Sequence, residues 1–440
     1  MAWTPPDASA LRGAAREAER IMKACVQPPE RPDTLTGRID SVLLHPVGGL
    51  VILLALLFVM FQAVFTWATP LMDGIEGALG LFGAWIATVM PDGIFQSLIV
   101  DGLISGVGSV LVFLPQILIL FFFILILEDC GYLPRAAFLL DRLMGSVGLS
   151  GRAFIPLLSS FACAIPGVMA ARTIQNPRDR LTTIMIAPLM TCSARLPVYA
   201  LLIAAFIPDR EVAGFLNLQG LVLFVLYFAG IVSAMAVAWF LKRRSSYTQQ
   251  PLMMELPSYH WPHLGTLAIG LWERAKIFLM RVGTVILTMM VLLWFLSSFP
   301  GAPDNATHPP IYYSVAGMLG RALAVILEPI GFGWEIAIAL IPGMAAREVA
   351  VAALGTVYAL SGGDEVGDTL APMIKQAWSL ATGLSLLAWY VYAPQCIATL
   401  ATVRRETGSR RYAFIMAGYM FALAYAASFI TYRVALALGG

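Results

Sequence analysis

Three cysteines lie at interruptions of apolar segments, and they are the residues of this chain best suited to metal chemistry. Cys163 comes just before the Pro-Gly pair of SSFACAIPGVMAAR, and Cys192 and Cys396 each follow an Ala-Pro pair, in APLMTC and APQC. Thiolate sulfur binds divalent cations, and carbonyls released where proline breaks a helix can add oxygen ligands. We expect these thiols to form a cation site. The alternative is packing, because cysteine is common inside apolar helices.

Two further side chains near the same breaks are secondary candidates for that site. Met190 offers a thioether, although packing is the alternative interpretation for a methionine in an apolar segment. Glu348 is ionisable and lies in an apolar segment, where a charge is costly unless it has a partner. Its alternative role is a local ion pair with Arg347.

Other charged residues near these segments suggest supporting roles. Arg195 lies in the middle of an apolar segment and would repel a cation, so we expect it to pair with a carboxylate or to cap exposed carbonyls. Glu128 and Asp129 end another apolar segment, as an exit funnel for a cation or as a solvated helix end. The histidines lie outside the centres of the apolar segments, which argues against a buried imidazole site.

The composition predicts an integral membrane protein. Hydrophobic residues make up 59% of the 440 residues and charged residues only 12%, which is too little polar surface for a soluble fold of this size. The basic residues lie in loops beside apolar spans rather than on one solvated face, so we expect the lipid bilayer and not nucleic acid as a partner. We expect neither a disulfide framework nor an enzyme.

The Pro-Gly segment recurs as IPGMAAR, and each copy is followed by an apolar span broken at Ala-Pro. Broken apolar segments in matching positions of two halves are typical of transporter binding sites. The first copy carries arginine at both ends, Arg152 and Arg172, which favours a re-entrant hairpin over a crossing. Three spans separate the copies, so the two repeats should be inverted. The alternative is a plain bundle in which each hairpin is two ordinary spans.

The distribution of basic residues predicts the orientation. The segment Pro70 to Ser105 contains no Lys or Arg, whereas one span ends on Lys242, Arg243 and Arg244. The positive-inside rule then places the N-terminus on the cytoplasmic side of the membrane.

The predicted fold is all-α, with about seven transmembrane helices and two re-entrant hairpins in an inverted repeat. The expected parts are a cytoplasmic amphipathic segment at 1–44, a first repeat at 45–241 with its hairpin at 154–173 and broken helix at 181–207, a cytoplasmic connector at 242–277, and a second repeat at 278–440 with its hairpin at 336–360 and broken helix at 378–402.

Long ordered strings resemble the membrane (gate) domain of the FeoB-type ferrous iron transporters. They are RIDSVLLHPVGG from Arg38, VGSVLVFLPQILILFFFILILEDCGYLPRAAFLLDRLM from Val107, FIPLLSSFACAIPGVMAARTI from Phe154, APLMTCSARLPVYA from Ala187 and IPGMAAREVA from Ile341. The resemblance implies inward passage of Fe(II) as the transported ion, and it points to the same cysteines.

This sequence departs from that family at its N-terminus. The family usually begins with a GTP-binding domain, but none of the four lysines here follows a glycine, so GxxxxGK[ST] does not occur. We therefore expect no nucleotide to be bound by this chain, and a GTPase or a small accessory protein would act in trans. The sequence leaves the oligomeric state open, including a homo-oligomer.

Two alternatives come from other classes. Paired hairpins and broken helices also resemble concentrative nucleoside transporters, and polar residues at the breaks, such as Gln116, Thr191 and Gln395, are compatible with an organic solute. A membrane partner of a G-domain protein that transports nothing would use its cysteines only for packing.

Overall fold

A computed structural model describes residues 8–25, 34–91, 93–212, 216–243, 257–301, 303, 309–344, 347, 349–358, 366–394 and 396–439. These residues are almost entirely helical, and their β-structure is one antiparallel pair of short strands, Glu211–Val212 (β1) and Leu216–Asn217 (β2). Six of the described helices are long and apolar enough to cross a membrane, or up to seven if a bent pair is one span. The all-α membrane fold is therefore confirmed.

The first apolar segment is longer than the sequence suggested. After α1 (Ala8–Cys25) and α2 (Thr34–Leu43), the helices α3 (Gly48–Thr66) and α4 (Thr69–Val89) form one apolar helical segment of 42 residues. At 1.5 Å per residue it is about 63 Å long, roughly twice the hydrocarbon thickness of a bilayer. Pro70 does not end it, because it lies in the first turn of α4, where no N–H donor is needed.

The second span is also extended. It combines α5 (Ile94–Ser97), a π-helical stretch η1 (Leu98–Ile104), α6 (Ser105–Val112) and α7 (Leu114–Asp129) into 36 residues. The expected span from Gly106 to Leu127 is its second part.

The first hairpin turns at Cys163. Helix α8 (Tyr132–Ser146) and the short η2 (Gly151–Ala153) lead into α9 (Phe154–Ala162), and α10 (Ala164–Ala170) and η3 (Ala171–Thr173) follow the turn. The arms α9 and α10 pack so closely that a Cβ on Gly167 would lie 1.9 Å from Ser160 Oγ and 2.7 Å from the Pro156 carbonyl oxygen. The Pro-Gly pair belongs to the second arm, since proline is tolerated in a first helical turn.

In the second hairpin, by contrast, the Pro-Gly pair ends the first arm. Pro342 and Gly343 close α18, and the turn follows them. The Pro-Gly phrase is therefore not at equivalent structural positions in the two hairpins. The helices of this region are α16 (Pro310–Tyr313), α17 (Val315–Leu327), η7 (Glu328–Ile330), α18 (Trp334–Gly343), α19 (Val349–Val357) and α20 (Val366–Ala377), with a bend of 111° between Val315–Ile330 and α18.

Each hairpin is followed by a broken span and then a continuous one. The first broken span comprises α11 (Pro177–Ile186), η4 (Ala187–Leu189), η5 (Ser193–Arg195) and α12 (Leu196–Phe206), and α13 (Leu218–Arg243) follows. The second comprises α21 (Leu380–Tyr392) and α22 (Ile397–Thr407), and α23 (Arg410–Ala437) follows. Both breaks fall at the Ala-Pro pairs, as the sequence indicated.

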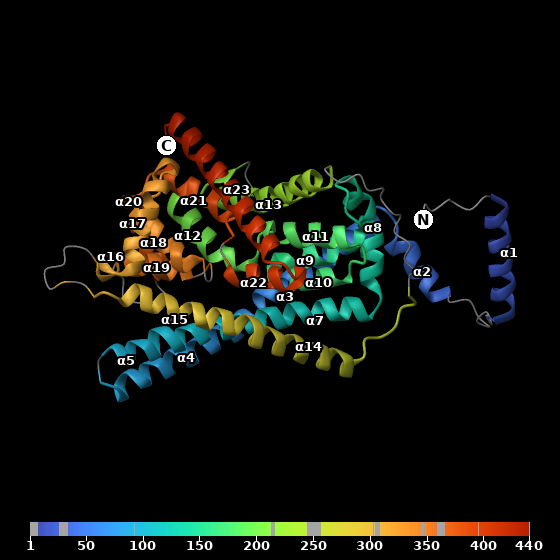
Figure 1. Cartoon of the computed structure of the whole chain (residues 1–440), viewed down its shortest axis with the longest axis horizontal. Helices are drawn as coiled ribbons and strands as arrows, with labels where there is room; N and C mark the ends of the chain where they lie inside the picture. The colour runs from blue at the N-terminus through green and yellow to red at the C-terminus, as the bar shows by residue number, and fades with distance from the viewer. Residues whose placement is uncertain are drawn as a thin grey trace.

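The repeats are joined by a bent helix and pack on each other. This helix consists of α14 (Leu264–Phe278), a π-helical turn η6 (Leu279–Gly283) and α15 (Thr284–Ser298). Figure 1 shows α16 to α20 together at one end of the molecule and α8 and α2 at the other. We call the end where α13 and α22 finish, with Lys242, Arg404 and Arg405, the basic end.

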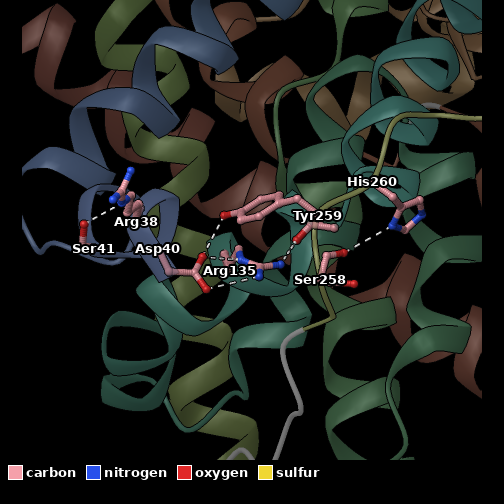
Figure 2. A network of polar contacts seen from close by, with 8 residues as sticks. Arg38, Asp40, Ser41, Arg135, Ser258, Tyr259 and His260 are labelled. Carbon is pink, nitrogen blue, oxygen red and sulfur yellow. Dashed lines mark hydrogen bonds and ion pairs between the residues drawn. The ribbon is translucent and has the colours of Figure 1, made fainter. Parts of the chain in front are cut away.

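A buried polar network ties three segments together at the basic end (Figure 2). Arg135 on α8 is 1% exposed and donates two hydrogen bonds, of 2.6 and 3.2 Å, to the Asp40 carboxylate of α2. Its guanidinium lies 3.8 Å from the ring centre of Tyr259 in the connector, and the Tyr259 hydroxyl donates to Asp40 at 2.8 Å. Burial and the neighbouring Asp40 carboxylate raise the pKa of Tyr259.

Candidate functional site

Each candidate cysteine occupies an extended residue directly before a helical turn. Cys163 (φ −153°, ψ 132°) precedes α10, Cys192 (φ −86°, ψ 163°) precedes η5 and then α12, and Cys396 (φ −161°, ψ 97°) precedes α22. The first N–H groups of a helix lack intrahelical partners and carry the positive end of the helix dipole. All three sulfur atoms therefore belong to chain positions that favour an anionic group.

The tip of the second hairpin connects the two broken spans. Arg347 is 5% exposed, and its Nη1 donates to Cys192 Sγ at 3.7 Å while its Nη2 donates to the Ala393 carbonyl at 3.4 Å. The carbonyl of Met344 accepts the N–H of Ile397, the first residue of α22, at 3.1 Å. The two breaks and this hairpin tip therefore form one polar centre inside an apolar protein.

Cys396 is the thiol that links this centre to the first hairpin. It directly precedes Ile397, whose N–H donates to the Met344 carbonyl at the tip of the second hairpin. It also packs, together with Cys163, against an apolar cluster that contains Ile165 and Ala398. In the part of the chain that the structure describes, no three His, Cys, Asp or Glu residues are close enough to hold a metal ion. The thiols therefore lie in the same region of the protein but do not form a complete set of metal ligands. The metal site stays a prediction.

Arg195 caps the carbonyls of its own broken span. It is fully buried, and its guanidinium donates to the carbonyls of Pro188 at 3.0 Å and Met190 at 3.2 Å, with longer contacts to the Leu189 carbonyl and Thr191 Oγ at 3.5 and 3.4 Å. Of the two roles expected for this arginine, the structure shows carbonyl capping. Because Arg347 likewise occupies the Ala393 carbonyl, these break carbonyls already accept hydrogen bonds.

The secondary candidates are not brought to the thiols by the described structure. Met190 is 5% exposed, and its side chain packs in a separate apolar cluster with Met185, Ile186 and Val403. Packing therefore accounts for its position. Glu348 lies outside the described residues.

Glu128 and Asp129, for which the sequence left an exit funnel and a solvated helix end open, contact residues of the connector. Glu128 lies 3.8 Å from Arg274 Nη2, and Asp129 accepts the backbone N–H of His263 at 2.8 Å. Asp129 also lies 3.8 Å from His260 Nε2.

A small pocket lies beside this centre, toward the basic end. Its apolar wall includes Phe121, Ile165 and Met169, which also belong to or pack on the cluster that holds Cys163 and Cys396. Its polar rim is formed by Arg274, Thr402, Arg405 and Glu406. The pocket was not foreseen from the sequence, because its wall combines α7, α10, α14 and α22, which are far apart in the chain.

Fold and site together define a polytopic α-helical membrane protein with two broken spans whose breaks carry cysteines. The family model Gate, described as nucleoside recognition, matches residues 110–206 and 279–410, and the model described as ferrous iron transport protein B C terminus matches residues 223–274. The chain belongs to the FeoB family.

Curated relatives named Fe(2+) transporter FeoB are longer than this chain. An Fe(2+) transporter FeoB of Leptospira interrogans is 41% identical over 436 residues, 94% of this chain and 62% of the relative. One of Staphylococcus aureus is 39% identical over 95% of this chain and 63% of the relative. A Porphyromonas gingivalis protein, named a fusion of Fe(2+) transport protein A and FeoB, is 38% identical over 92% of this chain and 52% of the relative. The chain thus spans about three fifths of the length of the first two relatives. No solved structure matches it.

Proposed function

We propose that this chain carries Fe²⁺ inward across the bacterial cytoplasmic membrane, through the centre formed by the two breaks. The observation that carries the proposal is that Arg347, at the tip of the second hairpin, contacts both broken spans, through Cys192 Sγ in the first and through the Ala393 carbonyl, three residues before Cys396, in the second. The relatives named Fe(2+) transporters support the identity of the ion. Borderline cations such as Fe²⁺ bind sulfur, and thiolates can replace the water that the ion must lose.

The proposed route leaves the centre through the pocket toward the basic end. Met169 and Thr402 line the pocket and could offer weak ligands to a passing ion. The positive-inside rule supports assignment of the basic end to the cytoplasm, since Lys242, Arg404 and Arg405 lie there.

Arg347 sets the main electrostatic constraint on this proposal. A guanidinium that contacts Cys192 repels an arriving dication, so binding at the centre requires the tip of the second hairpin to move or its charge to be balanced by deprotonated thiols. Metal binding and hairpin motion are therefore coupled in the proposed mechanism.

The partners of the proposed transporter are the bilayer, the ion and proteins that act in trans. The fusion in the Porphyromonas gingivalis relative supports a small accessory protein as one of them. A GTPase in trans and assembly of several copies are further parts of the proposal.

Uptake of radiolabelled Fe²⁺ into proteoliposomes under reducing conditions tests this function. We expect Cys192→Ser and Cys396→Ser each to lower the initial rate about tenfold or more, because loss of a ligand lowers metal affinity on that scale. Cys163→Ser should reduce uptake less than these two, because Cys163 lies at the turn of the first hairpin and not at the break of either span. Cys25→Ser is the matched control, since Cys25 is exposed on α1. Normal uptake by the Cys192 and Cys396 variants would refute the thiol centre.

A second candidate is transport of an organic solute, which the nucleoside-recognition description of the Gate match favours. Thr191, in the first break, is fully buried, and Gln116 on α7 is also buried. Uptake of a radiolabelled nucleoside into the same proteoliposomes separates the two functions. Nucleoside uptake that unlabelled nucleoside inhibits and Fe²⁺ does not would support transport of an organic solute. If neither solute crosses, the chain is a membrane partner of another protein.

A further inference from the structure

A buried ion cluster joins the two repeats at the basic end, and we call Arg172, Arg180 and Glu406 the Glu406 clamp. The Glu406 side chain is 3% exposed, and its carboxylate accepts two hydrogen bonds from Arg172, of 2.5 and 2.6 Å. Arg180 lies 3.6 Å from the same carboxylate and donates to the Glu406 carbonyl at 3.3 Å. A bidentate Arg–carboxylate pair is the strongest form of this interaction in proteins.

The clamp connects elements that must separate if the basic end opens. Arg172 directly follows the first hairpin, and Arg180 lies on α11 of the first broken span. Glu406 lies near the end of α22, the second half of the other broken span. No other described carboxylate forms an ion pair with Arg172 or Arg180.

The clamp also borders the path from the basic end to the thiols. Glu406 lies on the rim of the pocket whose wall includes Ile165 and Met169, on the second arm of the first hairpin. Ile165 belongs to the cluster against which Cys163 and Cys396 pack. Movement of α22 away from the first hairpin would therefore widen the pocket and expose these two sulfur atoms.

We propose that the Glu406 clamp is a latch that holds the basic end of the pathway closed, and that its opening gives access to Cys163 and Cys396. The inference rests on the proposed transport, because a latch has a purpose only if something passes. Its strength fits a gate: the carboxylate is buried, so losing its partner is costly, while Arg172 is about half exposed and can exchange its partner for water.

Thiol accessibility tests the latch without iron. The full chain in nanodiscs is treated with a small charged thiol reagent, and the modification rate of each cysteine is measured by peptide mass spectrometry. In Glu406→Gln, we expect Cys163 and Cys396 to react about tenfold faster than in the wild type, relative to the exposed Cys25 as an internal reference. Arg404→Gln, an exposed change on the same helix, is the control and should leave the rates unchanged.

Arg172→Gln keeps the inference testable if Glu406→Gln does not fold, because Arg172 is 54% exposed. This variant should raise the same two rates by a smaller factor, since Arg180 remains beside Glu406. The double variant should then react no faster than Glu406→Gln alone. Unchanged rates at Cys163 and Cys396 in Arg172→Gln would overturn the latch. If Cys163 and Cys396 react faster in these variants but the wild-type chain takes up no Fe²⁺, the latch is supported and the proposed function is refuted.

Discussion

Arg195 and Arg347 are both buried in the apolar interior, yet their guanidinium groups have different acceptors. Arg195 donates to successive carbonyls of its own broken span, whereas Arg347 reaches from the second hairpin to both breaks. The first holds one element in shape, and the second joins three elements.

Replacement of Arg195 should mainly affect stability. Arg195→Gln would leave buried carbonyls without donors, so we expect the free energy of unfolding to fall by about 3 kcal/mol. The thermal unfolding midpoint in detergent measures this, with the exposed Arg404→Gln as the control. A midpoint equal to that of the control would show that the cap is not needed.

Tyr259 gives a pH-dependent prediction. Its pKa is raised in the folded protein by burial and by Asp40, so the folded state retains the proton to higher pH than the unfolded state does. Stability is therefore unaffected below about pH 10, and the contribution is lost as pH rises from there toward the folded pKa.

The comparison with Tyr259→Phe isolates this residue. We expect the variant to lose less stability than the wild type between about pH 10 and 12, measured by thermal unfolding across that range. The comparison is needed because burial also raises the pKa of Tyr132, to about 12, on the neighbouring α8. Parallel pH profiles for the two proteins would contradict the prediction.

Among single residues, the sequence predicted the cysteines at the breaks but not the contacts of the charged side chains around them. The Ala-Pro pairs locate Cys192 and Cys396 because proline removes a helical hydrogen bond at a known position. The contacts of Arg347 with Cys192 and of Arg172 with Glu406 join residues 155 and 234 positions apart. No local pattern records such pairs.

Among the elements, the first hairpin depends on one close approach. Gly167 allows α10 to lie against Ser160 and the Pro156 carbonyl of α9. A methyl group there must push the arms apart, because the carbonyl belongs to the backbone and cannot turn away.

Gly167→Ala should therefore destabilise the protein by about 2 kcal/mol, a typical cost of overpacking. Gly418→Ala in α23 is the matched control: a Cβ there meets nothing within 4 Å, so alanine should be neutral or slightly stabilising. Thermal unfolding of both variants decides the matter, and equal midpoints would argue against close packing of the arms.

The elements themselves were largely predictable, but their joints were not. Apolar length and the Ala-Pro breaks indicated the spans. The Pro-Gly phrase does not locate the turn of a hairpin, because proline is found in the first turn of a helix in α10 and in the last turn in α18. Local sequence does not decide between these positions, since packing against the opposite arm does.

For the whole molecule, we propose an orientation in which the basic end faces the cytoplasm. Intact cells that carry Ser258→Cys or Gly301→Cys, treated with an impermeant thiol reagent, provide the test. Ser258 lies in the connector near α14, and Gly301 follows α15 at the opposite end of that bent helix. We expect labelling at position 301 and protection at position 258 until the cells are opened. The reverse pattern would invert the proposed direction of transport.

The position of Cys396 has a mechanical consequence. Cys396 forms the joint at which α22 begins, and Glu406 lies ten residues further on, about 15 Å away along the helix axis. If α22 pivots by about 10° at that joint, its far end moves by roughly 2.6 Å, which is about the length of the ion pair with Arg172. Helix α22, the second half of the broken span, would thus move as one rigid body, with Cys396 at the pivot and the Glu406 carboxylate near the end that moves most.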